Sequence, residues 1–249
     1  MKYIESRNNQ EIKDVYTLRT SSARQKQNLF IAEGQRTCTT LIESKIKLKQ
    51  LYITEEQRHT AISQIIDDNK LSVVTEPVMQ KISQAKTPSG ILGVFYIPAQ
   101  PPENISSGMI LTQISDPGNM GTLIRSCAAM DAQSIVVVEG VDPWSFKVVQ
   151  STAGFIGHVN IFQWNWEQTK KHAKKHTLNL FALVVSDGKD IKTLKKEKGL
   201  LVVGSEAHGI PSQWIKECDT SITLKMPGNV ESLNAAVAGS IALYLISTQ

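Results

Sequence analysis

The sequence has no run of about 18 consecutive apolar residues, the length that a membrane-spanning helix requires. Its first ten residues, MKYIESRNNQ, lack the apolar core of a signal peptide, so we expect the chain in the cytoplasm. The three cysteines, Cys38, Cys127 and Cys218, are odd in number and form no CxxC pair. This pattern argues against a disulfide framework or a zinc ribbon and predicts reduced thiols.

Several common site motifs are also absent. No GxGxxG follows a predicted strand, no Lys-Ser/Thr follows the glycines of GSEAHGIP, and GxSxG does not occur. A dinucleotide site, a P-loop and the usual hydrolase elbow are therefore not supported. His172 and His176 have the spacing of a zinc pair, but four lysines flank them and no acidic residue lies between them. A solvated helix face is the favoured interpretation, and no metal site is expected.

What the sequence does contain is the ordinary composition of a folded protein, with 41% hydrophobic and 20% charged residues in 249. That length allows one large domain or two small ones. The net charge of +4 is confined to residues 1–100, which carry 14 basic and 10 acidic residues, whereas residues 101–249 carry 13 of each. A basic first half suits a phosphate backbone, but a solvated helix face explains the charge equally well.

The stretch 98–108 is rich in proline and serine and reads as a linker. Before it, residues 1–97 alternate helical stretches at 34–45 and 55–68 with apolar strand candidates at 29–33, 48–53, 71–75 and 90–97, which predicts a small α/β domain. After it, residues 109–249 hold continuously apolar runs at 109–114, 134–140, 180–186 and 199–205, as expected for a buried parallel sheet. An amphipathic helix, with Leu233, Val237, Ile241 and Tyr244 on one face, ends the chain.

Three loops remain as candidates for chemistry, and each follows a predicted strand or turn where α/β sheets bind ligands. In the first, 114–132, we expect Asn119 to cap a helix that Gly121 opens and that carries Arg125 about one turn in. The second, 202–211, contains Gly204 and Glu206, and the third, 224–238, enters the last helix. Taken singly, each loop is explained at least as well by ordinary turn and capping residues.

Taken together, the three loops resemble the motifs of the SpoU (TrmH-like) RNA 2'-O-methyltransferases of the SPOUT superfamily. Motif one corresponds to Asn119-x-Gly121-x3-Arg125, motif two to Gly204-x-Glu206-x2-Gly209-Ile210-Pro211, and motif three to Met226-x-Gly228-x-Val230-Glu231-Ser232-Leu233-Asn234. The segment from Asp142 to Gly154 also fits, and NLFIAEGQR and TPSGILGVF resemble the ribosomal-protein-like α/β domain that binds RNA in many members. One departure is Lys225, where the family usually has proline.

The resemblance implies a C-terminal parallel sheet with a trefoil knot, S-adenosylmethionine as cofactor, no metal, and a homodimer. It assigns catalysis to Arg125 and Asn119. It assigns the cofactor pocket to the following residues of motifs two and three: Gly204, Glu206, Leu224, Met226, Ser232, Leu233 and Asn234.

The implied reaction is methyl transfer to a ribose 2'-hydroxyl in structured RNA, ribosomal rather than transfer RNA. Within the first domain we expect Arg24 and Lys26 to anchor phosphates, because they lie in a polar, basic segment. The alternative is a non-catalytic RNA-binding or ribosome-assembly factor that keeps the fold. Intact Asn119, Arg125, Glu206 and Asn234 argue against it, and Lys225 argues mildly for it.

Overall fold

The computed structural model describes residues 1–194, 197–228 and 232–248. The chain forms two compact units. The first unit comprises Met1–Ala99 and Trp144–Gly157, and the second comprises Gln100–Pro143 and His158–Gln249. This division differs from the boundaries expected from the sequence, which place 144–157 with the second domain and treat 98–108 as a linker.

The first unit is built on a five-stranded mixed sheet in the order β1-β4-β3-β5-β2. Strand β5 (Ile91–Tyr96) pairs antiparallel with β2 (Leu29–Glu33) and β3 (Leu48–Ile53), while β4 (Leu71–Val74) pairs parallel with β3 and with β1 (Lys2–Ile4). Its helices are α1 (Gln10–Thr17), α2 (Ser21–Gln27), α3 (Gln35–Glu43), α4 (Ala61–Gln64), α5 (Glu76–Ile82) and α7 (Phe146–Ser151). The four strands expected in this half are confirmed.

Strand β2 is buried on both faces, which explains why its residues 29–32 are continuously apolar. Leu29 and Ile31 pack into a cluster with residues of α1 and α5. The alternate residue Phe30 faces the other way, where its ring contacts Trp144 at a centroid distance of 4.9 Å. At the end of the strand, Gln150 donates a hydrogen bond of 2.8 Å to the Glu33 carbonyl. These contacts are the reason that residues 144–157 belong to the first unit.

Two expectations for the first unit are wrong. The single helix expected over 55–68 is instead the 3-10 turn Glu55–Gln57, α4 and a second 3-10 turn, Asp68–Lys70. Arg24, expected to anchor phosphate, is only 5% exposed and donates a 2.8 Å hydrogen bond to the Leu18 carbonyl. It lies on the inner side of α2, whereas Lys26 on the same helix is exposed.

The second unit contains a seven-stranded sheet in the order β10-β12-β9-β11-β6-β7-β8, and every pairing in it is parallel. The expected apolar runs form β6 (Gly108–Thr112), β7 (Ser134–Val138), β9 (Asn179–Leu183) and β11 (Gly199–Val203). The structure adds β8 (Asn160–Gln163), β10 (Lys189–Asp190) and β12 (Thr220–Thr223). The expectation of an α/β fold with a parallel sheet is confirmed.

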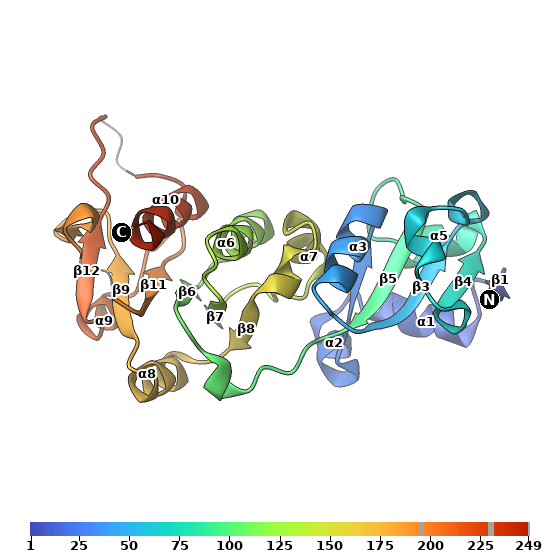
Figure 1. Cartoon of the computed structure of the whole chain (residues 1–249), viewed down its shortest axis with the longest axis horizontal. Coiled ribbons are helices and arrows are strands. Elements are labelled where there is room, and N and C mark those ends of the chain that lie inside the picture. Colours follow the sequence, from blue (N-terminus) through green and yellow to red (C-terminus); the bar gives the residue numbers. More distant parts are fainter. Residues whose placement is uncertain (195–196, 229–231, 249) are drawn as a thin grey trace. The chain divides into compact units, whose positions relative to one another are not determined.

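Helices cover both faces of this sheet, so its central strands are buried. Helices α6 (Pro117–Ala129) and α10 (Ala235–Ser247) lie together on one face, and α8 (Trp166–Lys175) and α9 (Ser212–Lys216) lie on the other (Figure 1). The first pair packs closely: Gly239 lies against Leu123, and the hydroxyls of Ser126 and Ser240 are 2.7 Å apart. No helix in the described residues is long and apolar enough to cross a membrane.

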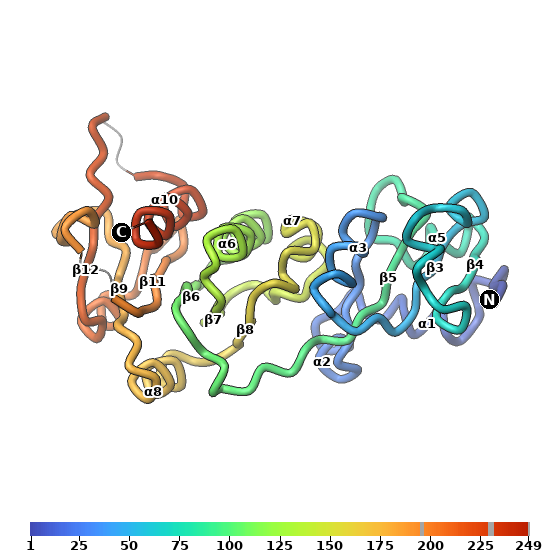
Figure 2. Tube along the Cα trace, viewed as in Figure 1, coloured from blue at the N-terminus to red at the C-terminus, as the bar shows by residue number. Residues whose placement is uncertain are grey.

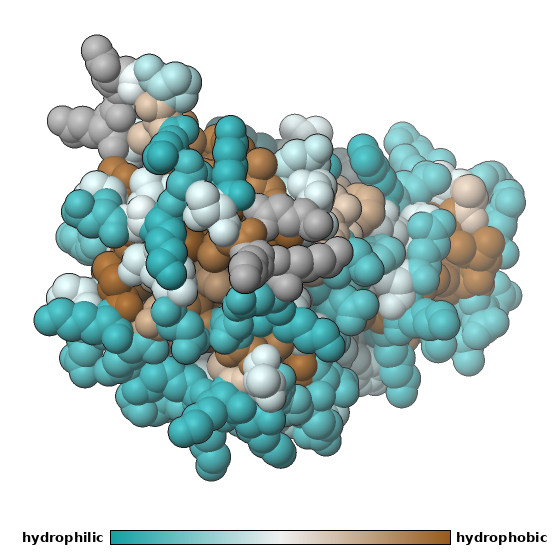
Figure 3. Space-filling model, turned by 60° about the vertical axis from the view of Figure 1, so that its left-hand side comes forward, coloured by the Kyte–Doolittle hydropathy of each residue, from teal (hydrophilic) through white to brown (hydrophobic). Residues whose placement is uncertain are grey.

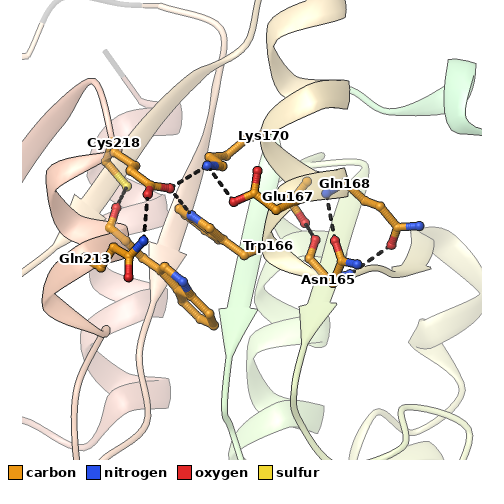
Figure 4. Close-up of polar contacts among 10 residues, drawn as sticks. Asn165, Trp166, Glu167, Gln168, Lys170, Gln213 and Cys218 are labelled. Atoms are coloured by element: carbon orange, nitrogen blue, oxygen red, sulfur yellow. Dashed lines mark hydrogen bonds and ion pairs between the residues drawn. The ribbon is translucent and has the colours of Figure 1, made fainter.

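On the opposite face, a polar network fastens α8 to the segment after α9 (Figure 4). The Trp166 indole donates to Glu217 at 2.7 Å, and Lys170 lies 2.6 Å from Glu217 and 2.8 Å from Glu167. The hydrogen bond and charge of Lys170 hold the pKa of Glu217 below its usual range. These hydrogen bonds and ion pairs hold α8 against the segment that follows α9.

Candidate functional site

The second unit has a cavity of about 340 Å³ at the carboxyl ends of β9 and β11 and the start of α10. All seven residues expected in a cofactor pocket line it: Gly204, Glu206, Leu224, Met226, Ser232, Leu233 and Asn234. They arrive from two segments of the chain, because the path leaves β11, forms the loop 204–211 and α9, and returns through β12 toward α10 (Figure 2). Parallel strands with helical crossovers bring both loops to one edge of the sheet, where such folds bind ligands.

Three side chains connect the motifs beside this cavity. The Asn234 side-chain oxygen accepts hydrogen bonds from the backbone amides of Ala236 and Val237, at 2.9 and 3.2 Å, and so caps α10. Backbone amides only donate, so this cap fixes which way the Asn234 amide points. Its Nδ2 then donates to Oδ1 of Asn119 at 3.1 Å, and Asn119 donates through Nδ2 to the Glu206 carboxylate.

The direction of this chain of hydrogen bonds sets the role of Glu206. Each amide donates toward the carboxyl group, so Glu206 is the acceptor at the end of this series of hydrogen bonds. Glu206 is exposed and lines the cavity, which leaves carboxylate lone pairs for a hydroxyl or an amine of a ligand. Motif one thus positions a wall residue of the cavity through Asn119, even though Asn119 itself does not line the cavity.

Helix α6 begins earlier than the sequence suggested. Asp116 is its N-cap and accepts a hydrogen bond from the Asn119 amide at 2.8 Å, and Pro117 is the first helical residue. The interpretations of Asn119 as a cap and of Gly121 as the opening of the helix are therefore wrong. Because Asp116 provides the cap, the Asn119 side chain is available for Glu206 and Asn234.

Arg125 lies further along the same helix, exposed to solvent. It is not among the residues that line the cavity. Within one chain, the structure therefore unites motifs two and three and links Asn119 to them, while Arg125 is exposed and does not line the cavity.

Gly204 is required by the loop itself. A Cβ atom there would lie 2.2 Å from the Gly209 carbonyl carbon and 2.4 Å from the Ile210 nitrogen. The loop folds back on itself, with the Gly209 amide donating to the Ser205 carbonyl at 2.9 Å. Gly209 has a different reason to be glycine, since its φ of +65° lies in the left-handed region.

The end of β9 and the two residues after it also form part of the cavity wall, although the sequence does not predict it. Leu183, Val184 and Val185 line it, and Val185 is 64% exposed, which is unusual for valine. The run LFALVVS is uniformly apolar, so nothing in it separates residues buried in the sheet from residues facing a ligand. Only its place next to β11 in the sheet could have identified them.

Lys225 does not line this cavity, although its neighbours Leu224 and Met226 do. Its ammonium lies 3.1 Å from the Asp190 carboxylate, and together with the Lys192 amide it lowers the pKa of Asp190. The Lys225 side chain is therefore not part of the cavity wall formed by the described residues. Val230 and Glu231 of motif three lie outside the described residues.

The apolar side of α10 expected from the sequence is exposed. Val237, Ile241 and Tyr244 are 45%, 42% and 52% exposed, and Leu233 before the helix is 37% exposed. The buried side consists instead of small residues and Leu243. Hydrophobic surface is visible between hydrophilic residues on the face of the second unit drawn in Figure 3. In the same unit, an apolar groove lies between α10 and the segment 224–228.

The histidines of α8 form no cluster with other metal-binding side chains among the described residues. The expectation of a fully solvated face is nevertheless wrong for them, because both are half-buried. His172 stacks on Trp164 at a centroid distance of 4.4 Å. Burial, with help from Lys171 and Lys175, lowers the pKa of His172.

Comparison with known proteins identifies the family. Residues 107–244, more than half of the chain, match the SpoU rRNA Methylase family. The chain belongs to this family. Residues 9–93 match the MRM3-like substrate binding domain. The resemblance inferred from the three motifs is confirmed.

Similar proteins share the whole length of the chain. The 23S rRNA (guanosine(2553)-2'-O)-methyltransferase RlmP of Bacillus subtilis (strain 168) is 26% identical over 98% of both chains. A solved structure of an AdoMet-bound rRNA methyltransferase from Sinorhizobium meliloti is 26% identical, covers 98% of this chain and 97% of its own, and superposes with a TM-score of 0.87. The SpoU methyltransferase AviRb from Streptomyces viridochromogenes, 19% identical and covering 97% and 98%, shares the fold with a TM-score of 0.86.

Proposed function

We propose that this chain transfers a methyl group from S-adenosylmethionine to a ribose 2'-hydroxyl in ribosomal RNA. The observation that carries the proposal is the single cavity in which the residues of motifs two and three meet, within a chain of the SpoU rRNA Methylase family. The relative named RlmP is an rRNA 2'-O-methyltransferase, and the Sinorhizobium structure is described as AdoMet-bound.

The cavity suits this cofactor chemically. Its volume of about 340 Å³ lies within the usual range of small-molecule sites. Leu183, Val203 and Leu224 offer apolar walls to an adenine ring, and Glu206 offers a carboxylate to hydroxyls or an amine. When bound, the sulfonium supplies an already activated methyl group, so the protein has only to hold the acceptor in line and manage one proton.

We assign the handling of the acceptor hydroxyl, as it loses its proton, to Arg125. Its guanidinium stays charged because the pKa of arginine exceeds about 12, which makes it a poor base but a good partner for phosphate and for a developing alkoxide. We infer that Arg125 orients the hydroxyl and stabilises the negative charge that develops on its oxygen as the proton passes to solvent water. Asn119 acts differently, as a positioning residue that holds Glu206 and Asn234.

The exposed position of Arg125 supports a homodimer in which a second copy completes the site. The apolar face of Val237, Ile241 and Tyr244 with the adjoining groove offers a surface for that copy. We propose that two chains associate through this face, and that the C-terminal segment forms the trefoil knot of the family. We further propose that the first unit is the RNA substrate-binding domain, in line with its match over 9–93. We expect the protein in the cytoplasm with its RNA.

The test combines binding and turnover. The purified full-length chain is titrated with S-adenosylmethionine by calorimetry and then incubated with ribosomal RNA and isotopically labelled cofactor, and 2'-O-methylation is mapped. We expect heat of binding and one modified ribose. Heat without methylation of any ribosomal RNA would overturn the substrate assignment. Absence of both would support the non-catalytic RNA-binding or ribosome-assembly factor instead.

A further inference from the structure

Tyr16 on α1 lies on the surface of the first unit beside the basic side chains of Arg19 and Lys81. The tyrosine is 44% exposed. The Arg19 guanidinium carbon lies 4.4 Å from the centre of its ring, and the Lys81 ammonium lies 5.9 Å from the same point. Lys81 belongs to α5, so the ring sits where two helices meet. Arg7, which is exposed, approaches the same place from the segment before α1.

These cations are held in place by backbone carbonyls. Arg19 donates to the carbonyls of Lys81, at 2.8 Å, and Ser83. The Lys81 ammonium donates to the Arg7 carbonyl at 2.7 Å, and Arg7 Nε donates to the Pro77 carbonyl at 3.1 Å. Carbonyls orient a cation without neutralising it. Within the described ranges, the ion pairs found include none between Arg7, Arg19 or Lys81 and a carboxylate.

A second exposed tyrosine of the same unit, Tyr3, also lies beside an arginine, but there the positive charge is paired with a carboxylate. Tyr3 is 55% exposed, and the Arg58 guanidinium carbon lies 5.9 Å from its ring centre. That guanidinium, however, forms an ion pair of 3.0 Å with Glu55, and the hydrogen bond that it donates to the Glu55 carboxylate raises the pKa of Arg58. The charge at Tyr3 is therefore balanced locally, whereas the charge around Tyr16 is not.

An exposed aromatic ring beside ordered, unbalanced cations is the combination that binds single-stranded nucleic acid. Unpaired bases stack on aromatic rings and on arginine planes, and cations neutralise the phosphates on either side. We propose that Tyr16, Arg7, Arg19 and Lys81, named here the Tyr16 patch, bind an unpaired nucleotide of the RNA. Its base extends the tyrosine and guanidinium stack, and Arg7 and Lys81 take the flanking phosphates.

The inference rests on the proposed function, because it needs an RNA substrate, and it goes further by naming the contact surface and the single-stranded character of what binds. Three of the basic residues behind the net positive charge of residues 1–100 belong to the Tyr16 patch. Arg24, which the sequence favoured, is buried against Leu18 and is not available to phosphate.

The experiment measures binding of the full-length chain to a short labelled single-stranded RNA of mixed sequence and to a duplex of the same strand. Loss of a stacking ring costs between about 5-fold and 100-fold in affinity. We therefore expect Tyr16→Ala to weaken single-strand binding by that factor and duplex binding much less, and Tyr16→Phe to bind like the wild type. The matched control is Tyr3→Ala, which removes an equally exposed tyrosine and should change affinity by less than a factor of about 2.

The charges are tested separately by salt. Each phosphate contact on single strands adds about 0.7 to the slope of log affinity against log salt, so Arg7→Gln with Lys81→Gln should flatten the slope by about 1.4. Lys45→Gln with Lys49→Gln, which removes two exposed lysines of the same unit, is the control and should change the slope by less. Thermal unfolding of each variant verifies that the unit remains folded.

Three results would overturn the proposal: Tyr16→Ala binding single strands like the wild type, Tyr3→Ala losing as much affinity, or Tyr16→Ala losing as much affinity for the duplex as for the single strand. Failure here is distinguishable from failure of the proposed function. A wild-type chain that methylates ribosomal RNA while Tyr16→Ala binds normally removes only the Tyr16 patch. A wild-type chain without cofactor binding or methylation removes the function itself.

Discussion

Asn234 donates a hydrogen bond of 3.1 Å to the side chain of Asn119, joining residues 115 positions apart in the sequence. The same Asn234 caps α10, and the same Asn119 holds Glu206. The start of the last helix, the start of α6 and the wall of the cavity therefore share one polar contact. A substitution of Asn119 should therefore affect the start of α10, the start of α6 and the cavity wall.

Replacing Asn119 with aspartate tests the direction of this contact. Asn119→Asp removes the donor and sets a second carboxylate against Glu206, so it should cost more than Asn119→Ala. We expect a stability loss of up to about 1 kcal/mol at neutral pH, because these contacts are exposed, together with weaker cofactor binding. Repulsion raises the pKa of such paired carboxylates, so the loss should shrink as the pH falls toward about 4. Thermal unfolding as a function of pH measures this, and an equal effect of aspartate and alanine would contradict it.

Arg125 should separate chemistry from cofactor binding. Because it is exposed and does not line the cavity, Arg125→Ala should abolish methyl transfer while leaving S-adenosylmethionine affinity nearly unchanged. Turnover and cofactor calorimetry on the same variant provide the measurement, with Arg125→Lys as the variant that keeps the charge. If Arg125→Ala keeps more than about a tenth of its activity, a barrier change below about 1.4 kcal/mol, Arg125 has no part in the mechanism.

The two glycines of the loop 204–211 should respond differently to the same substitution. Gly204→Ala places a Cβ within 2.2 Å of the Gly209 backbone, so the loop must open and the cofactor should bind at least tenfold more weakly. Gly209→Ala meets no atom within 4 Å and suffers only the left-handed backbone, a cost of about 1 to 2 kcal/mol. Gly209→Asn should cost less than that. Calorimetry and thermal unfolding compare them, and normal cofactor binding by Gly204→Ala would show that the loop adapts.

Arg24 should behave as a structural residue. Arg24→Met keeps the aliphatic stem and leaves the Leu18 carbonyl without its donor, at a cost of about 1 to 3 kcal/mol. The salt dependence of RNA binding should remain that of the wild type, because the guanidinium is buried. Denaturant unfolding and titrations at several salt concentrations check both statements. A flatter salt slope would return Arg24 to the RNA-binding surface.

The sequence was informative where one local pattern had one structural meaning. The runs at β6, β7 and β11 are apolar because both faces are covered, and they were recognised as buried strands. Strands β8 and β12 are shorter and mix polar with apolar residues, so their apolar content gave no signal.

Burial of single polar residues required the tertiary structure. Arg24 lies in SSARQKQ, which is polar throughout, and only the packing of α2 decides that it points inward while Lys26 points outward. In the candidate site, the motif residues were found from the sequence, whereas Val185 and the link through Asn119 depend on which strands and helices become neighbours.

The inclusion of Trp144–Gly157 in the first unit also bears on the order in which the protein can be completed during its synthesis. When the first 99 residues have been translated, Phe30 still lacks the Trp144 ring and the Glu33 carbonyl still lacks the Gln150 amide. Translation must first pass through β6, α6 and β7. A fragment that stops at residue 97 would therefore lack the Trp144 ring against Phe30 and the Gln150 amide at the end of β2.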